Sequence, residues 1–316
     1  MDGKEPVVSV IMSIYKEPVD WIQKSIDSIL HQTYGDFEFL IVDDNPGRRE
    51  NELLLREYVQ SDPRVKAIRN DSNIGLTKSL NKAIGMARGF YIARMDADDV
   101  SYPERFRKQI EVFNQDRSIG ICGCAYNKIG GQTGVVLPPE FDAGATLCIE
   151  NCFAHSSVMF RRDLFKDACV YDESCVCAQD YELWSRLYRQ GVKFYNIQEP
   201  LLDYRVTENQ ISKTRMQNDV ARRSRRLCLD YMLEKVGADF RLGQSTVDYG
   251  IIHRIDKCEG IAQKTRQELV YYMFLSIGGN LMKKVSNMIP YWSTLSISQM
   301  VHIIYHHIRK TEIAKY

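Results

Sequence analysis

No glycine-rich phosphate-binding signature occurs in this sequence of 316 residues. The pattern G-x-G-x-x-G does not follow the first predicted strand, and G-x-x-x-x-G-K-[ST] occurs nowhere. Both patterns hold phosphates with backbone N–H groups at the start of a helix. Their absence argues against a Rossmann dinucleotide site and a P-loop. A phosphorylated ligand would therefore have to be held by a metal ion and by side chains.

Long apolar runs and paired cysteines are also missing. No stretch of 18 uncharged apolar residues is present, so there is no evident transmembrane span. Residues 1–5 lead directly into a predicted strand, without a signal peptide. The nine cysteines form no C-x-x-C pair, and the Cys122–Cys124 and Cys175–Cys177 spacings do not suit a zinc knuckle. We expect reduced, mostly buried thiols in a cytoplasmic protein, with any membrane contact peripheral at the inner face of the plasma membrane.

The formal net charge is only +1, but the charges are unevenly distributed along the chain. Residues 1–210 hold 25 Lys and Arg against 32 Asp and Glu, whereas residues 211–316 hold 17 against 9. We expect two regions, a catalytic domain over 1–212 and a basic helical extension over 213–316. The arginines of 222–226 and the mixed segments 268–286 and 297–309 fit either packed, solvated helices or contact with an anionic membrane. No nucleic-acid partner is expected.

Apolar strands alternate with helices over the first hundred residues. Runs at 7–12, 37–42, 64–69 and 90–95 have the length and composition of buried strands. Helical segments lie between them, the first with Ile22, Ile26 and Ile29 on one face. This order predicts an α/β fold with a mostly parallel central sheet and helices on both faces. Ligands of such sheets bind at the carboxyl ends of the strands.

Three carboxylates, Asp96, Asp98 and Asp99, directly follow the fourth predicted strand. Carboxylates so close together repel one another, so a buried strand that ends in them calls for a cation. Their hard oxygen ligands suit Mg²⁺ or Mn²⁺ carrying a phosphorylated ligand. The alternative is a solvated acidic turn that caps a helix near Pro103. Because residues 13–17 and 43–44 bring two further polar sets to the same sheet edge, we favour the metal site.

Two residues of those other sets could contact a nucleoside. Tyr15 offers a stacking platform for a base, and Asp44 could accept hydrogen bonds from a base or a ribose. An amphipathic tyrosine at the sheet edge would look the same in sequence.

Five segments in order carry a resemblance to a known family: Val8–Tyr15, Ser28–Tyr34, Phe37–Asp44, Asn73–Leu76 and Met95–Asp99. Together they resemble the family 2 glycosyltransferases, which have the GT-A fold. The similarity is strongest to bacterial members that build capsule, exopolysaccharide or O-antigen, including the amylovoran-type transferases. It covers roughly residues 6–210, and the extension after residue 212 lies outside it.

The resemblance implies a metal-dependent, inverting transfer of a sugar from a nucleotide-sugar donor, commonly a UDP-sugar. The cofactor would be Mn²⁺ or Mg²⁺. Asp96 and Asp98 match the D-x-D motif, with Asp98 the direct metal ligand, while Asp99 lies just outside the pattern in a supporting or capping role. The donor-binding residues that it implies in the first half are Ser13, Tyr15, Glu17, Asp44 and Asp96.

The second half would supply the catalytic base. Residues 151–162 resemble the family strand whose histidine lies near the donor, which implies donor binding by His155; a buried structural histidine is the alternative. Residues 178–184 resemble the segment that carries the base, which would be Asp180. A position at the start of a helix would keep that carboxylate ionised. Asp180 could also serve only as a helix cap.

One departure from the family pattern concerns metal binding. The family often continues with Tyr-Arg-x-His, but here the sequence reads Tyr204-Arg205-Val206-Thr207. Threonine is a poor ligand for a divalent metal beside carboxylates, so binding would depend on Asp98, the diphosphate and water, with His155 as a possible helper. Arg205 is expected to reach a donor phosphate or to form a structural salt bridge.

We therefore expect an inverting glycosyltransferase that extends a glycan or polyprenyl-diphosphate-linked acceptor for a surface polysaccharide. Two alternatives are open. The chain could act on a protein or a soluble glycan, or it could be a metal-dependent nucleotidyl-transfer or nucleotide-binding protein. Asp180 discriminates, because nucleotidyl transfer needs no base there for an acceptor sugar.

Overall fold

The computed structural model describes residues 5–131, 133–138, 146–148, 151–165, 170–207 and 215–235, together with residues 267, 270 and 295. The chain divides into two compact units, residues 1–147 with 151–224, and residues 148–150 with 225–316. The fold below is that of the first unit. The expected segments 268–286 and 297–309 lie outside the described residues, except for residue 270. The predicted domain boundary at residue 212 stays a prediction.

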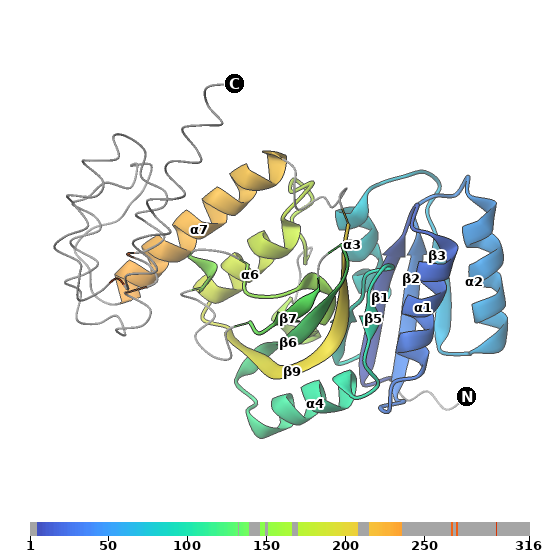
Figure 1. The fold of residues 1–316 in the computed structure, drawn as a ribbon, viewed down its shortest axis with the longest axis horizontal. Helices are drawn as coiled ribbons and strands as arrows, with labels where there is room; N and C mark the ends of the chain where they lie inside the picture. Colours follow the sequence, from blue (N-terminus) through green and yellow to red (C-terminus); the bar gives the residue numbers. More distant parts are fainter. Residues whose placement is uncertain are drawn as a thin grey trace. The chain divides into compact units, whose positions relative to one another are not determined.

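The first half of the sheet is parallel, as the alternating pattern predicts. The strands are β1 (Val8–Ile14), β2 (Phe37–Asp43), β3 (Val65–Arg69) and β4 (Tyr91–Arg94). They lie in the order β3-β2-β1-β4, with Val8 of β1 opposite both Phe37 and Tyr91. The connections are α1 (Val19–Leu30), α2 (Arg49–Ser61) and α3 (Leu76–Met86). All four strands therefore end at one edge of the sheet (Figure 1).

The second half makes the sheet mixed rather than mostly parallel. Antiparallel pairs join β4 to β8, β8 to β6, β6 to β7 and β9 to β5, whereas β6 and β9 run parallel. Register shifts between β6 and β9 mark bulges, and bulges bend strands; β9 curves strongly in Figure 1. The remaining elements are β5 (Val100–Ser101), α4 (Arg105–Gln115), β6 (Ile119–Gly130), β7 (Gly134–Val136), the 3₁₀ turns His155–Ser157 and Arg162–Leu164, β8 (Met159–Arg161), α6 (Gln179–Arg189), β9 (Lys193–Val206) and α7 (Arg215–Lys235).

The core of the parallel half follows from two periodicities. Along β1, Val10 and Met12 alternate with residues of the opposite face, and they belong to one buried cluster with Ile22, Ile26 and Ile29 of α1. Each such side chain contributes about 1.5–3 kcal/mol when it is fully buried. The predicted α1 face is therefore confirmed, and it packs α1 against the face of the sheet.

A buried carboxylate lies near the opposite ends of these strands. Glu38 of β2 accepts hydrogen bonds from the Ser9 hydroxyl (2.7 Å), the Lys66 ammonium (2.6 Å) and the Arg88 N–H (2.8 Å). Burial raises the pKa of Glu38, but these donors outweigh burial and hold the pKa below its ordinary value. A Cβ at Gly89 would lie 2.4 Å from the Ser9 nitrogen, so the chain needs glycine there.

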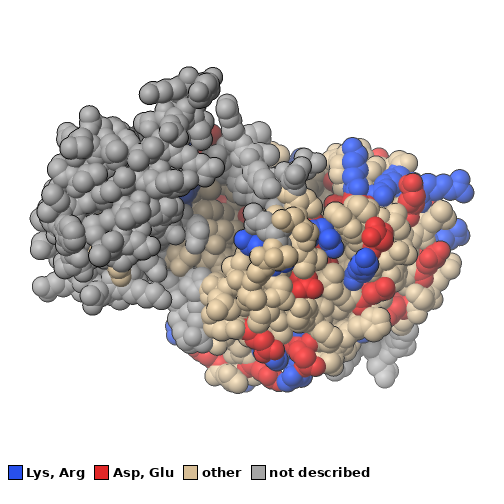
Figure 2. Space-filling model, viewed as in Figure 1, with Lys and Arg blue, Asp and Glu red and all other residues tan. Residues whose placement is uncertain are grey.

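The described helices, the thiols and the surface charges can be compared with the sequence. No helix in the described ranges is both long and apolar enough to cross a membrane. Cys122, Cys124 and Cys175 are buried free thiols, as expected from their spacing. Figure 2 shows basic and acidic side chains interspersed on the visible face of the described part.

Candidate active site

A cleft of about 440 Å³ lies at the carboxyl ends of the strands. It brings together every residue that the sequence singles out as a site residue: Ser13, Tyr15, Glu17, Asp44, Asp96, Asp98, His155, Asp180 and Arg205. Its further lining residues are Asn73, Gly75, Leu76, Arg94, Asp99, Ala178, Gln179, Tyr204 and Thr207. Residues as far apart as Ser13 and Thr207 thus share one cavity, although their individual roles stay predictions.

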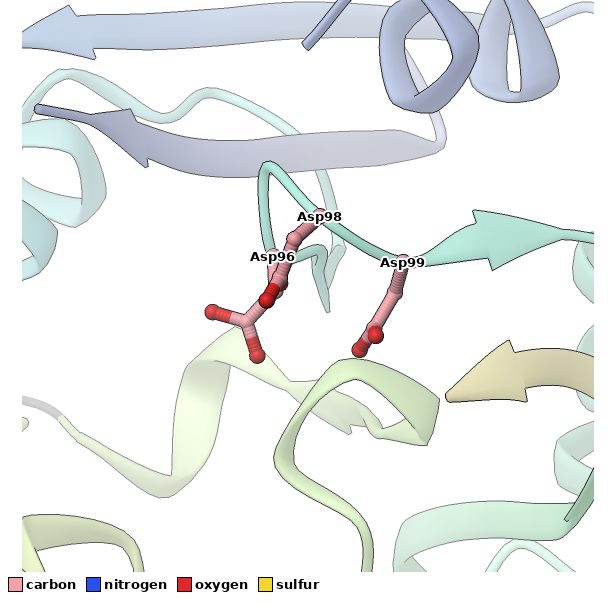
Figure 3. A group of neighbouring side chains, drawn as sticks. All are labelled: Asp96, Asp98 and Asp99. Carbon is pink, nitrogen blue, oxygen red and sulfur yellow. The ribbon is translucent and has the colours of Figure 1, made fainter. Parts of the chain in front are cut away.

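The acidic group lies in the loop between β4 and β5. One carboxylate oxygen from each of Asp96, Asp98 and Asp99 lies within 4.8 Å of the others. Figure 3 shows the three side chains projecting from this loop to the same side. The donor set consists of hard carboxylate oxygens, which is the chemistry that Mg²⁺ and Mn²⁺ prefer.

The three carboxylates differ in their partners. Asp96 forms an ion pair with the buried Arg94 and accepts a hydrogen bond from the Ser156 hydroxyl (2.7 Å). Burial raises the pKa of Asp96, but the Arg94 charge and the hydrogen bonds from Arg94 and Ser156 together outweigh burial and lower it. Arg94 also donates to the Ser156 hydroxyl oxygen (3.0 Å). Asp96 is thus already charge-compensated by the protein.

Among the described residues, no cation is paired with Asp98 or Asp99 as Arg94 is paired with Asp96. Burial, together with the Asp96 charge, raises the pKa of Asp98 to about 7. Burial and both neighbouring carboxylates raise the pKa of Asp99 well above its ordinary value. Asp99 accepts hydrogen bonds from Ser156 and from the Arg205 N–H (2.7 Å). A divalent cation would relieve this crowding, so the residues present fit a metal ion.

The alternative of an acidic cap for the next helix is wrong. At the start of α4 the Phe106 N–H donates to the Gln32 side-chain oxygen (3.1 Å), not to a carboxylate of the loop. Gln32 lies just after α1, and its amide also donates to the Tyr102 carbonyl (2.7 Å) and the Ser101 hydroxyl (3.1 Å). Helix starts need such acceptors for their unpaired N–H groups.

Ser25, Ser28 and Gln32, which we call the α1 polar edge, hold the acidic loop against α1. The Ser25 hydroxyl donates to the Asp96 carbonyl (2.6 Å), and the Ser28 hydroxyl accepts from the Ser101 N–H (3.0 Å). The spacing of these residues places them on one face of α1 and its continuation. Ser28 and Gln32 belong to the segment Ser28–Tyr34, one of the five that carry the resemblance. Their hydrogen bonds show what this segment does in the structure: it holds the residues that follow the acidic loop.

The nucleoside side of the cleft is built from two loops. Asp44 accepts hydrogen bonds from the Asn70 amide (2.8 Å) and from the N–H groups of Ile74 (2.8 Å) and Gly75 (2.9 Å). Gly75 has a φ of 86°, a conformation that favours glycine. Asp44 therefore fixes the loop 73–76 that lines the cleft, in addition to any contact with a ligand.

The end of β1 is fixed in a similar way. The Glu17 carboxylate accepts a hydrogen bond from the Tyr15 N–H (2.7 Å), and the Tyr15 carbonyl accepts from the amides of Asn45 (3.1 Å) and Asn51 (3.2 Å). The Lys16 ammonium lies 4.8 Å from the centroid of the Tyr15 ring. Glu17 thus shapes the turn that presents Tyr15 to the cleft.

His155 is an uncharged residue in this environment. Its Nε2 lies 2.7 Å from the Tyr171 hydroxyl, and its ring packs edge-on against Tyr171 and Trp184. Burial lowers the pKa of His155 well below its ordinary value, and the Arg94 charge acts in the same direction. Tyr171 is held by Asn81, which bonds both its N–H and its carbonyl (both 2.9 Å).

Asp180 lies in the first turn of α6. The N-cap residue is Ala178, which has the left-handed conformation with φ of 53°, so the interpretation of Asp180 as the cap residue is wrong. Burial raises the pKa of Asp180, against hydrogen bonds from the Tyr181 N–H and the Asn151 amide that lower it. The helix start is expected to keep this carboxylate ionised, and burial acts against that effect. The helix buries Leu183, Trp184 and Leu187, and this positions Asp180 at the cleft.

Arg205 joins β9 to the acidic loop. Its Nε donates to the Asp98 carbonyl (2.8 Å), and its guanidinium lies 4.2 Å from the centroid of the Trp21 ring. The predicted contact of Arg205 with a donor phosphate stays a prediction. Thr207, at the position where the resemblance expects histidine, lines the same cleft.

Sequence reasoning missed several partners of the site residues. Arg94 precedes the acidic triplet directly, and an arginine that ends a buried strand is itself a signal of a buried ion pair. Ser156, Tyr171 and Asn151 carry no such signal, because their roles depend on contacts 16 to 62 residues away in sequence.

Comparisons with known proteins agree with this fold. The family model described as Glycosyl transferase family 2 matches residues 9–169. An uncharacterised glycosyltransferase of Methanocaldococcus jannaschii is 36% identical over 222 residues, covering 67% of this chain and 76% of the relative. The O-antigen biosynthesis glycosyltransferase WbnJ of Escherichia coli is 32% identical over 66% of this chain and 83% of its own. The amylovoran biosynthesis glycosyltransferase AmsE of Erwinia amylovora is 28% identical over 66% and 79%, respectively. The chain therefore belongs to the family 2 glycosyltransferases, as the resemblance predicts.

Solved structures confirm the predicted GT-A fold class. The crystal structure of S. aureus TarS in complex with UDP-GlcNAc superposes with a TM-score of 0.59 at 15% identity, over 96% of this chain and 91% of that one. The mannosyltransferase PcManGT of Pyrobaculum calidifontis, in complex with GDP-Man and Mn²⁺, gives a TM-score of 0.54 at 16% identity, over 99% and 89%. At these identities the likeness concerns the fold.

Proposed function

We propose that this chain is an inverting glycosyltransferase that transfers a sugar from a UDP-sugar to a glycan acceptor, a lipid-linked oligosaccharide of surface polysaccharide synthesis. The observation that carries the proposal is the shared cleft, in which the Asp96–Asp99 group and Asp180 line one cavity of about 440 Å³. A cation site and a separate carboxylate in one cavity are what glycosyl transfer from a nucleotide sugar needs.

The donor would bind with its nucleoside near Tyr15 and Asp44 and its diphosphate near the acidic loop. Ser13, Glu17, Asp96, His155 and Arg205 complete the proposed donor-binding set. The relatives' complexes with UDP-GlcNAc and with GDP-Man and Mn²⁺ support a nucleotide-sugar donor. Asp98 would hold Mn²⁺ or Mg²⁺, with Asp96 beside it. When bound, such an ion neutralises the negative charge that grows on the departing diphosphate.

Asp180 would act as the general base. The acceptor hydroxyl oxygen attacks the anomeric carbon from the face opposite the diphosphate, and the Asp180 carboxylate takes the hydroxyl proton. The new glycosidic bond forms as the bond to the diphosphate breaks, so the configuration inverts. Burial raises the pKa of Asp180, and a carboxylate with a raised pKa accepts a proton more readily than an exposed one. His155, whose pKa burial lowers, would contact the donor without adding a positive charge beside the metal ion.

The proposed acceptor and location follow from the named relatives and from the thiols. Relatives named for O-antigen and amylovoran biosynthesis favour a surface-polysaccharide acceptor. The buried free thiols of Cys122, Cys124 and Cys175 fit a reducing compartment, and hence work on the cytoplasmic side of the membrane. Peripheral membrane contact through the region after residue 212 completes the proposal.

A donor panel tests the proposed function. The protein is incubated with UDP-, GDP- and dTDP-sugars and Mn²⁺, and the nucleotide products are separated by chromatography. We expect release of the nucleoside diphosphate, dependent on the divalent ion and abolished by EDTA. Release of UMP or pyrophosphate would instead favour nucleotidyl transfer. A purified acceptor protein, soluble glycans and a lipid-linked oligosaccharide are then compared as acceptors. Transfer to the protein or to the soluble glycans, and not to the lipid-linked oligosaccharide, would favour the alternative acceptors.

A further inference from the structure

Asn151 stands beside the proposed base in a defined geometry. Its side-chain amide donates a hydrogen bond to the Asp180 carboxylate, with 2.6 Å between Nδ2 and Oδ2. Its side-chain oxygen accepts a hydrogen bond from the Phe153 N–H at 3.2 Å. Because a backbone N–H can only donate, this second bond fixes which end of the amide faces Asp180. The amide therefore presents its N–H group, and not its oxygen, to the carboxylate.

The short loop that carries Asn151 is anchored to the helix that carries Asp180. Phe153 packs edge-on against Trp184 of α6, with ring centroids 5.4 Å apart, and against Phe194 of β9 at 5.5 Å. Both Phe153 and Trp184 are buried. This buried aromatic packing therefore holds the loop with Asn151 next to the helix with Asp180.

We propose that Asn151 is a positioning residue for Asp180: it aims the carboxylate and stabilises its ionised form, so that Asp180 can act as a base at neutral pH. The inference rests on the proposed function, in which Asp180 takes the acceptor proton. A donor that bonds to the charged form of a carboxylate opposes the effect of burial. The hydrogen bond from Asn151 therefore offsets part of the rise in the Asp180 pKa that burial causes.

Several titratable groups share the cleft with Asp180. Arg94, at the end of β4, and Tyr171, in the segment before α6, are the side chains whose charges act on Asp180 or respond to it. Both have pKa values above their ordinary ones, and the pKa of His155 lies well below its own. Asp98, whose pKa burial raises to about 7, also lines the cleft. The ionisation of Asp180 is therefore followed through its own assigned NMR signal, which separates it from the ionisation of Asp98.

The test measures the ionisation of Asp180 directly, without needing an acceptor. Protein labelled with ¹³C at the aspartate carboxyl carbon is titrated by NMR, and the Asp180 signal is assigned by its loss in Asp180→Asn. Asn151→Leu removes the N–H donor and keeps the side-chain size. Asn127→Leu is the matched control, because it removes a similar amide bond to Asp203 (3.1 Å) between β6 and β9, outside the cleft lining.

We expect the Asp180 midpoint to rise by about one pH unit in Asn151→Leu, the size of a hydrogen bond to a charged group, and to stay unchanged in Asn127→Leu. An unchanged midpoint in Asn151→Leu overturns the inference. Should Asn151→Leu fail to fold, as judged by circular dichroism, Asn151→Ala gives the same test at this partly exposed position.

A second measurement separates positioning from simple structural support. In Asn151→Leu, the rate of UDP release from the donor should fall about tenfold at low pH and recover toward the wild-type rate above the raised midpoint. An equal loss at every pH would contradict the inference. If wild-type protein releases no nucleoside diphosphate from any donor, the proposed function fails, while the NMR result still decides whether Asn151 controls Asp180.

Discussion

The sharpest structural prediction concerns Gln32, at the end of the α1 polar edge. The substitution Gln32→Leu keeps the side-chain volume but removes the acceptor of the Phe106 N–H and the donor to the Tyr102 carbonyl. Gln32 is buried, so the Phe106 N–H loses this acceptor away from bulk water, whereas the Tyr102 carbonyl keeps its hydrogen bond from the Arg105 N–H (3.1 Å). An unsatisfied buried group costs about 1–3 kcal/mol, so we expect a loss of that size in the free energy of unfolding.

Urea unfolding followed by circular dichroism measures this loss. The control is Gln23→Leu, an exposed position on the same helix, for which the change should stay within about 0.5 kcal/mol. Because Gln32 also holds the segment 101–106 that follows the acidic loop, Mn²⁺-dependent UDP binding should weaken in Gln32→Leu and not in Gln23→Leu. An unfolding free energy for Gln32→Leu within about 0.5 kcal/mol of wild type would refute the reasoning.

Two further predictions concern charge. Asp98→Ala should weaken UDP binding about tenfold or more when Mn²⁺ is present and leave metal-free binding unchanged, as measured by calorimetry, since the proposed metal ligand is lost; equal affinities with Mn²⁺ would count against the metal assignment. Glu38→Gln should lower the melting temperature at pH 7 but much less at pH 3. The pKa of Glu38 is lowered in the fold, so its contribution is present above the unfolded value near 4.5 and lost on acidification; a difference independent of pH would contradict this account.

The first half of the fold could be predicted because its signals are local. Each strand from β1 to β4 is a short apolar run, each helix has its own periodicity, and the right-handed crossover rule then allows few arrangements. The polar residues at the strand ends meet because parallel strands end at one edge. This is why Ser13, Asp44 and Asp98 could be placed in one cleft from the sequence.

The second half could not be derived in this way. β8 has only three residues and pairs with β4 and β6 across long separations, so no local pattern predicts its antiparallel direction. The partners of the site residues are also set by tertiary contacts. Arg94, which pairs with Asp96, also donates a hydrogen bond to the buried Ser156. Burial raises the pKa of Asp180, and the hydrogen bond from Asn151 lowers it. The sequence predicts that Asp180 lies near the start of a helix, but it does not predict that the Asp180 side chain is buried.

The most direct test of the central claim compares wild-type protein with Asp180→Asn in the same donor assay. Calorimetry should give UDP affinities within twofold of each other in the presence of Mn²⁺, because Asp180 is not placed at the nucleotide. Transfer of the sugar should fall at least about 100-fold, the usual scale of general-base catalysis. Near-normal transfer by Asp180→Asn would contradict the account, because the cleft would then carry out the reaction without its proposed base.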